Sequence, residues 1–217
     1  MNTEQARFNM IEQQIRPWNV LDAGVLSLLA VVRREDFVPA AHRALAFMDV
    51  EVPLGAGQVM LAPRVEARVL QELKVQRHEK VLEIGAGSGY MAALLGHKAQ
   101  SVHTLETDPG LAAKATENLR RAGVLNVTVH QQDGAAGLAA EAPFDAIVLS
   151  GSVAEVPQAL LAQLKVGGRL VAVVGDEPVM VAQLIQRTGE QSYVSRPLFD
   201  TVAPRLVGFA EHSAFQF

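Results

Sequence analysis

The chain has 217 residues, of which 49% are hydrophobic and 19% charged, so it can bury a sizeable core and is not a disordered, collagen-like or coiled-coil protein. Its 19 Lys and Arg against 23 Asp and Glu give a net charge of -4, which lacks the positive field that phosphate backbones attract. The absence of cysteine excludes disulfide scaffolds, thiolate zinc sites and cysteine nucleophiles. We therefore expect one domain, residues 1–217, with no nucleic-acid partner.

The N-terminus and the apolar runs give no sign of export or membrane insertion. Residues 1–7 are polar and do not resemble the apolar part of a secretory signal. The longest apolar stretch, residues 25–32, falls far short of the roughly 20 residues that span a bilayer. We expect a cytoplasmic protein with no membrane partner.

Residues 1–75 are predicted to form a helical extension and a loop on the substrate side of the domain. Apolar residues recur at three- and four-residue spacing, first at Phe8, Ile11 and Ile15 and then over residues 21–32. This spacing predicts two amphipathic helices.

Between the extension and the rest of the chain, the pattern becomes mixed. Residues 50–58 alternate and are then interrupted by glycine, which predicts a short strand or hairpin running into a loop. Residues 64–73 are again predicted to be helical.

Residues 76–217 alternate short β-rich runs with helical ones, a pattern typical of a parallel sheet with crossover helices. The predicted elements are, in order, strand Lys80–Ile84, helix Tyr90–Leu95, strand Val102–Glu106, helix Pro109–Ala122, strands Val127–His130 and Phe144–Ser150, helix Pro157–Leu164 and strand Arg169–Val174. The tail from Val179 onward predicts an antiparallel pair that closes the sheet.

Residues 81–90 combine a strand, a glycine-rich turn and a helix start. Such a turn lets backbone N–H groups approach a ligand, and Gly87 and Gly89 lack the Cβ atoms that would block that approach. Glu106, 21 residues after Gly85, ends the next strand, where a carboxylate can bind ribose hydroxyls. The sequence therefore predicts a nucleoside site.

The spacing of the glycines distinguishes between nucleosides. They follow G-x-G-x-G rather than the dinucleotide pattern G-x-G-x-x-G, and Tyr90 stands where the third dinucleotide glycine would be. A cofactor with a pyrophosphate is therefore disfavoured.

The ordered set Glu83, G-x-G-x-G, Glu106 and Asp133 resembles the class I S-adenosylmethionine methyltransferases. The resemblance implies a doubly wound, mostly parallel Rossmann-like α/β sheet with helices on both faces. It also implies that S-adenosyl-L-methionine is the cofactor. The implied cofactor-binding residues are Glu83, Gly85, Gly87 and Ser88 towards the methionine end, Glu106 at the ribose, and Asp133 with Gly134 at the adenine amino edge. Alternatively, these are turn and cap residues of any doubly wound fold, and Asp133-Gly134 also suits a plain turn.

Further segments are similar to those of the protein-L-isoaspartate O-methyltransferase family, in order along most of the chain. They are Met10–Arg16, Arg34–Pro39, Phe47–Asp49, Pro53–Gln58, Val81–Tyr90, Gln132–Gly134 and Gly167–Leu170. The resemblance implies methylation of the abnormal carboxylate of isoaspartyl residues, the first step of a repair through succinimide. The implied partner is a protein or peptide with an isoaspartyl residue.

The acceptor side departs from that family. Where the family has Gly-Gln-Thr-Ile-Ser, this chain has Gly57-Gln58-Val59-Met60-Leu61, so the serine at the substrate carboxylate is replaced by Leu61. Loss of that donor beside a buried carboxylate would cost roughly 1 to 3 kcal/mol. We expect Asp49, Gln58, Met60 and Leu61 to face the acceptor.

Three hypotheses follow from this departure. In the first, the chain is an isoaspartyl carboxyl methyltransferase in which Asp49 or backbone N–H groups near Gln58 replace the serine. In the second, it methylates a different acceptor in an apolar pocket lined by Met60 and Leu61. In the third, it binds the cofactor without catalysis and its helical extension docks a partner.

Other chemistries find little support. The six histidines show no i, i+4 pair and no carboxylate at ligand spacing, so we expect no metal site. Ser150 follows an apolar strand, but G-x-S-x-G is absent, which argues against a hydrolase nucleophile. We expect Ser150 at the substrate mouth, at the carboxyl end of its strand.

Overall fold

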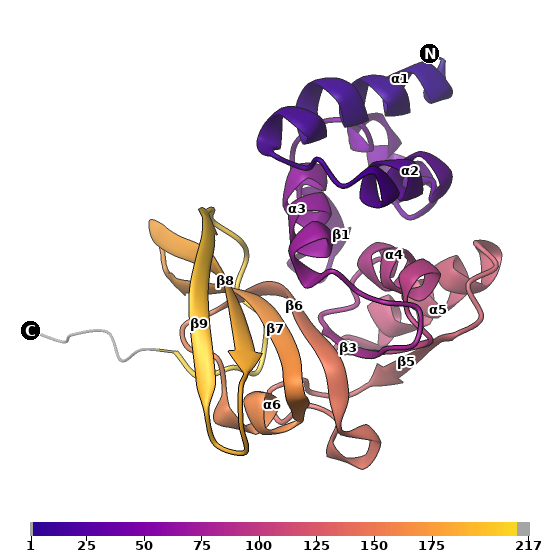
Figure 1. The fold of residues 1–217 in the computed structure, drawn as a ribbon. Helices are drawn as coiled ribbons and strands as arrows, with labels where there is room; N and C mark the ends of the chain where they lie inside the picture. Colours follow the sequence, from indigo (N-terminus) through magenta and orange to yellow (C-terminus); the bar gives the residue numbers. More distant parts are fainter. Residues whose placement is uncertain (1, 212–217) are drawn as a thin grey trace, which may run out of the picture.

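The computed structural model describes residues 2–211 and contains a seven-stranded sheet, a separate two-stranded hairpin and helices around both (Figure 1). The strands are β1 (Val52–Gly55), β2 (Gln58–Met60), β3 (Lys80–Ile84), β4 (Ser101–Glu106), β5 (Val127–Gln131), β6 (Phe144–Val153), β7 (Leu164–Asp176), β8 (Val179–Arg187) and β9 (Tyr193–Asp200). The α-helices are α1 (Thr3–Asn9), α2 (Ala23–Val31), α3 (Pro63–Leu73), α4 (Tyr90–Lys98), α5 (Pro109–Arg121) and α6 (Gln158–Ala162).

The large sheet has the order β5-β4-β3-β6-β7-β8-β9. Strands β3 to β7 pair in parallel, whereas β8 and β9 are antiparallel additions at one edge. The predicted α/β class is confirmed, including the mostly parallel sheet and the antiparallel pair after residue 179. The strand order reverses between β3 and β6, and open α/β sheets bind ligands at the carboxyl ends of strands at such a point.

Each face of the sheet packs into its own hydrophobic core. Side chains alternate along β3, so that Val81 faces a core formed with α3, α4, α5 and the N-terminal helices. Leu82 faces the opposite core, which contains Leu160 of α6. Helices therefore lie on both faces, as predicted, although one face has only the short α6 (Figure 1).

The N-terminal extension is helical, but its buried face differs from the prediction. After α1 the chain continues as a π-helical turn, Met10–Ile15, and then a short 3-10 turn. The wider π turn changes the phase of the helix. As a result Phe8, predicted on the buried stripe, is 58% exposed, while Met10 is fully buried beside Ile15.

Three element boundaries near the middle of the chain also differ from the prediction. The strand predicted over residues 144–150 continues to Val153, because register shifts let β6 keep pairing with β7. The helix predicted over residues 157–164 is only α6, since Leu164 already begins β7. The glycine pair before Arg169 lies within that strand, at one of the shifts, rather than at its entry.

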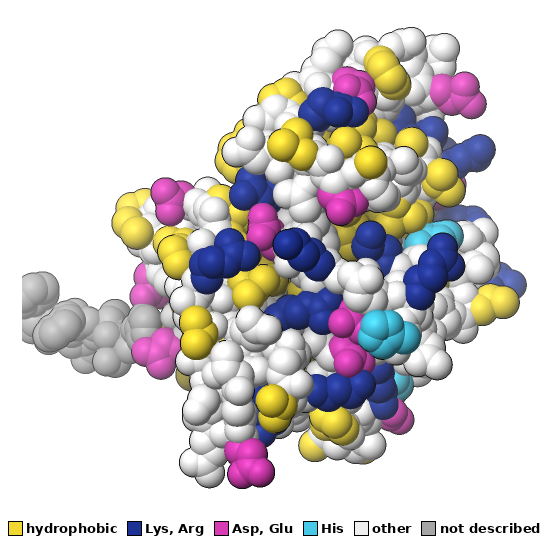
Figure 2. Space-filling view, viewed as in Figure 1, with side chains coloured by type: hydrophobic (Ala, Val, Ile, Leu, Met, Phe, Trp, Pro, Cys, Tyr) yellow, Lys and Arg dark blue, Asp and Glu magenta, His cyan; other side chains and the backbone are white. Residues whose placement is uncertain are grey.

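The surface carries charges of both signs. Figure 2 shows basic, acidic and hydrophobic side chains interspersed on the face that is viewed. None of the helices within residues 2–211 combines the length and apolar character needed to cross a bilayer.

Candidate functional site

The glycine turn between β3 and α4 adopts a backbone that only glycine accepts easily. Gly85, Gly87 and Gly89 have φ of +92°, +50° and +82°. A Cβ on Gly85 would lie 2.8 Å from Leu206 Cδ2, and one on Gly87 would lie 3.0 Å from Leu54 Cδ1. The two glycines therefore leave room for Leu206, near the C-terminus, and for Leu54, on β1, to pack against the turn.

Four backbone N–H groups of the turn donate hydrogen bonds within the protein. Gly85 and Ala86 donate to the carbonyl of Leu105 on β4, and Gly89 donates to the carbonyl of Ala86. The N–H of Gly87 donates to Glu106 Oε2 over 2.8 Å. The bonds from Gly85, Ala86 and Gly87 hold the turn against β4, and the missing Cβ atoms of its glycines leave space beside it.

Glu106 lies at the carboxyl end of β4, as predicted, and is buried. Besides Gly87, its carboxylate accepts from the N–H of Asp108, 3.1 Å from Oε1. Asp108 also caps α5 by accepting from Leu111 N. Since each carboxylate oxygen has two acceptor sites, Glu106 is held in place and can still accept from ribose hydroxyls.

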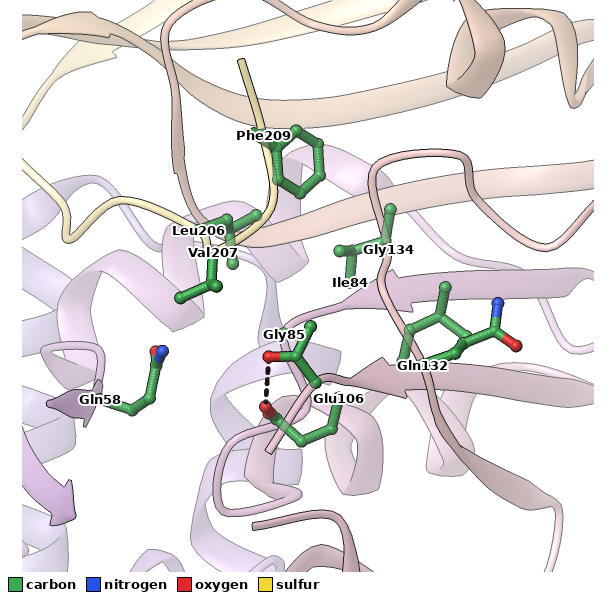
Figure 3. A pocket seen from close by; sticks show the side chains of 11 residues that line it. Gln58, Ile84, Gly85, Glu106, Gln132, Gly134, Leu206, Val207 and Phe209 are labelled. Carbon is green, nitrogen blue, oxygen red and sulfur yellow. Dashed lines mark hydrogen bonds between the residues drawn. The ribbon is translucent and has the colours of Figure 1, made fainter. Parts of the chain in front are cut away.

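A first cavity, here named the ribose cavity, opens beside Glu106 (Figure 3). Its lining residues are Gln58, Ile84, Gly85, Leu105, Glu106, Thr107, Gln132, Gly134, Leu206, Val207 and Phe209. A carboxylate and three neutral polar side chains beside apolar walls suit a ligand with hydroxyls on a sugar and a flat apolar base.

One wall of the ribose cavity comes from the C-terminal segment, residues 203–209, which the sequence analysis did not assign. In Figure 3, Leu206, Val207 and Phe209 lie on one side of the cavity and Gln132 and Glu106 on the other. The segment is attached to the end of β6, where the N–H of residue 152 donates to the carbonyl of residue 204 and the N–H of residue 206 donates to the carbonyl of residue 152. The sequence of residues 204–209, Pro-Arg-Leu-Val-Gly-Phe, contains no local pattern that predicts this role.

A second cavity, here named the inner cavity, lies between hairpin β1–β2 and the glycine turn, with about 250 Å³ of empty space. It is lined by Leu54, Val59, Met60, Leu61, Glu66, Glu83, Gly85, Ala86, Gly87, Ser88, Met91 and Ser150. The structure thus brings the predicted acceptor residues Met60 and Leu61 to the predicted cofactor residues. Ser150 lies there as well, directly after Leu149, the last residue of β6 that pairs with β3.

Glu83 is fully buried at the floor of the inner cavity. Its two carboxyl oxygens accept hydrogen bonds from Thr104 Oγ1, 2.7 Å away, and Ser150 Oγ, 2.8 Å away. Burial raises the pKa of Glu83 to about 8, and the two hydroxyl bonds only partly oppose this. Glu83 is therefore mostly protonated near neutral pH, and its bonds join β3 to the neighbouring strands.

At the other end of the ribose cavity, Asp133 and Gly134 take different places. Gly134 lines the cavity, and a Cβ there would lie 2.3 Å from Ile84 Cγ2. The Asp133 side chain is exposed, is not among the lining residues of either cavity and accepts from Ala135 N over 2.8 Å. Its geometry is that of the plain turn considered as the alternative.

The remaining predicted residues are divided between the two cavities and the surface. Gln58 lines the ribose cavity. Asp49 lines neither cavity and forms an ion pair with Arg64 over 3.0 Å. Leu61 presents an apolar side chain to the inner cavity, while its carbonyl accepts from Arg34. Among the four residues predicted to face the acceptor, Asp49 is therefore the one that lines neither cavity.

Within residues 2–211, no group of three or more His, Asp or Glu side chains is arranged to hold a metal ion. His103 and His130 face each other over 3.0 Å on β4 and β5. One of the six histidines, His212, lies outside the described residues.

A mostly parallel sheet with a glycine turn after β3, a carboxylate at the end of β4 and a cavity between them is the arrangement of an α/β methyltransferase fold. A family model described as protein-L-isoaspartate(D-aspartate) O-methyltransferase matches residues 5–204. The sequence is 42% identical over 184 residues to the protein-L-isoaspartate O-methyltransferase of Methanoculleus marisnigri, covering 84% of each chain. It is also 42% identical over 200 residues to that of Rhodopseudomonas palustris, covering 92% of each chain. The chain belongs to the protein-L-isoaspartate O-methyltransferase family.

The fold agrees with a solved structure of this family. A Plasmodium falciparum protein described as a β-aspartate methyltransferase, determined with S-adenosyl-L-homocysteine, superposes with a TM-score of 0.76 at 21% identity. The match covers 95% of this chain and 98% of that chain. The superposition confirms the predicted fold, and the family model with the 42% identical relatives confirms the family resemblance seen in the sequence.

Proposed function

We propose that this chain transfers a methyl group from S-adenosylmethionine to the carboxylate of isoaspartyl residues in proteins or peptides. The observation that carries the proposal is the pair of adjoining cavities on the two sides of the glycine turn. One is suited to a nucleoside and the other lies under the hairpin that departs from the family pattern. Family membership supports the reaction, and the cavities supply the place for it.

The residues of the ribose cavity fit the cofactor. Glu106 would accept from the ribose hydroxyls, and Gly134 with the apolar residues of β3 and the C-terminal segment would enclose the adenine. Gly85, Gly87 and Ser88 would line the methionine end, because Gly85 lines both cavities and the other two line the inner cavity next to it. When bound, S-adenosylmethionine supplies a methyl group on a sulfonium that is already a good leaving group.

The protein's own task is positioning rather than proton transfer. A carboxylate is a nucleophile at neutral pH, so no general base is needed. Hairpin β1–β2 would hold the acceptor over the glycine turn, and the apolar Met60 and Leu61 would exclude water. Such an arrangement lowers the activation barrier by aligning the reacting atoms.

The acceptor carboxylate needs donors other than the family serine. Asp49 is engaged by Arg64, so it is the weaker candidate of the two considered from the sequence. The better candidates are backbone N–H groups near Gln58, on the hairpin, and the Ser150 hydroxyl, which could turn from Glu83 towards a ligand. We place the chain in the cytoplasm, a location that suits its lack of cysteine.

Labelled S-adenosylmethionine tests the proposal directly. The protein is incubated with an isoaspartyl peptide and, separately, with its normal aspartyl twin. We expect base-labile label only on the isoaspartyl peptide. Label transferred to another acceptor would favour a different methyltransferase, and cofactor binding without transfer to any acceptor would favour a protein that has lost catalysis.

A further inference from the structure

Glu66, on the first turns of α3, is a buried acid that the proposed function leaves unused. The residue is 4% exposed and lines the inner cavity. Its Oε2 pairs with the guanidinium of Arg34. Its Oε1 has no hydrogen-bond partner among residues 2–211. Since Glu66 lines the cavity and this oxygen has no donor in the described part of the chain, it can accept a hydrogen bond from a ligand there.

Arg34 belongs to the framework around Glu66 rather than to the cavity. It is fully buried, donates from Nη2 to the Leu61 carbonyl over 2.7 Å and lies over the Tyr90 ring, 5.3 Å from its centroid. These contacts fix the position of Glu66 Oε2 and leave Oε1 as the free end. Burial still raises the pKa of Glu66 to about 7, although Arg34 lowers it.

The chemistry of the inner cavity favours a cationic ligand at Glu66. Its lining contains two carboxyl groups and no lysine or arginine. Both oxygens of Glu83 already accept from a hydroxyl, whereas Glu66 Oε1 accepts from no donor within residues 2–211, so Glu66 has the greater acceptor capacity to spare. The same cavity is bounded by Gly85 to Ser88, which the proposed function assigns to the methionine end of the cofactor. That end carries an ammonium and a carboxylate and, before transfer, a sulfonium, and it is the two cationic groups that suit Glu66.

We propose that Glu66 binds the cationic end of the cofactor through its free Oε1 oxygen. The inference rests on the proposed function and adds to it a binding residue outside the glycine turn. Glu66 lies one turn before Val69 and Leu70 on the buried face of α3, which places it opposite the turn rather than within it. The methionine end would then lie between the glycine turn and α3.

Calorimetric titration of the Glu66→Gln protein with three ligands tests the assignment. S-adenosylmethionine carries ammonium and sulfonium, S-adenosylhomocysteine carries only the ammonium, and methylthioadenosine carries neither. We expect the affinity for the first two to fall about tenfold and that for methylthioadenosine to stay within twofold. A fall confined to S-adenosylmethionine would still support a cation site and would locate it at the sulfonium.

The result that overturns the assignment is an equal change, or no change, for all three ligands. Because Glu66→Gln leaves Arg34 buried without its ion partner, the double variant Arg34→Met with Glu66→Met is titrated alongside it. Retained methylthioadenosine binding shows that either variant is folded. Glu72→Gln, on the same helix, is the matched control, because Glu72 lines neither cavity and pairs with Arg68 and Arg196, so the three affinities should stay unchanged.

The unaltered protein separates this inference from the proposed function. If it binds none of the three ligands, both fail together. If it binds them and Glu66→Gln binds them equally well, only the role of Glu66 is overturned.

Discussion

The glycine turn and hairpin β1–β2 lie against each other but contribute to the site in different ways. The turn contributes through its backbone, since three positive φ angles and missing Cβ atoms make room for Leu54 and Leu206. The hairpin contributes through side chains, and Met60 and Leu61 give the cavity its apolar lining. A substitution at a glycine of the turn would therefore disturb the backbone of the site. A substitution of a hairpin side chain would change only the lining that faces the acceptor.

Gly85→Ala should have the largest effect on the backbone side of this comparison. The new Cβ would meet Leu206, and φ of +92° is strained for alanine. We expect calorimetric affinity for S-adenosylhomocysteine to fall about 30- to 100-fold, on the order of 2 to 3 kcal/mol. Gly123→Ala is the control, because Gly123 has φ of +72° with nothing near its Cβ position. A similar loss of affinity in both variants would mean that strain alone is responsible.

Glu83→Gln should change how stability depends on pH. The pKa of Glu83 is raised in the folded state, so its carboxyl supports folding below about pH 4.5 and loses that contribution as pH rises towards 8. Glutamine stays neutral, so the variant should gain stability relative to wild type over this range, on the order of 2 kcal/mol. Denaturant unfolding at several pH values measures it, with exposed Glu190→Gln as control. A difference that does not vary with pH would contradict the buried, protonated carboxyl.

Glu106→Gln should weaken cofactor binding by about tenfold, or about 1.4 kcal/mol, because the amide has only one oxygen for Gly87, Asp108 and the ribose. Binding of S-adenosylhomocysteine by calorimetry measures this. Glu117→Gln, exposed on α5, should leave the affinity unchanged. Unchanged affinity in Glu106→Gln would remove the ribose assignment.

Leu61→Ser should have the smallest effect of these substitutions, and it changes the apolar lining of the inner cavity rather than the glycine turn. The introduced hydroxyl can donate to an acceptor carboxylate in the inner cavity, so we expect isoaspartyl turnover to rise about threefold with cofactor affinity unchanged. Leu61→Ala removes the same bulk without adding a donor and should not raise turnover. If both variants behave alike, space rather than hydrogen bonding limits the acceptor.

Much of the glycine turn and the elements around it could be predicted, because the sequence patterns that indicate them are local. Helix α5 was predicted within one residue, since Asp108 caps its start, Pro109 suits its first turn and Gly123 follows its end with positive φ. The glycine spacing and the carboxylate after the next strand likewise lie within one stretch of chain. Their order alone indicates a nucleoside site.

The parts that could not be predicted depend on contacts between distant segments. The C-terminal wall depends on Leu206 meeting Gly85 and on bonds to Ser152, which no local pattern records. Glu66 had a signal in principle, because it shares the apolar face of its helix with Val69 and Leu70. What the pattern cannot show is that Arg34, from another helix, makes a charge at that position tolerable.

The attachment of residues 203–209 to β6 affects the order in which the site is assembled during synthesis. Glu106 precedes Leu206 by about a hundred residues, so in a growing chain the ribose cavity stays open on one side until Leu206 has been made. A nascent chain that ends after β9 would have its sheet but not the closed cavity. The segment that closes the cavity is thus made well after the turn and the carboxylate that it covers.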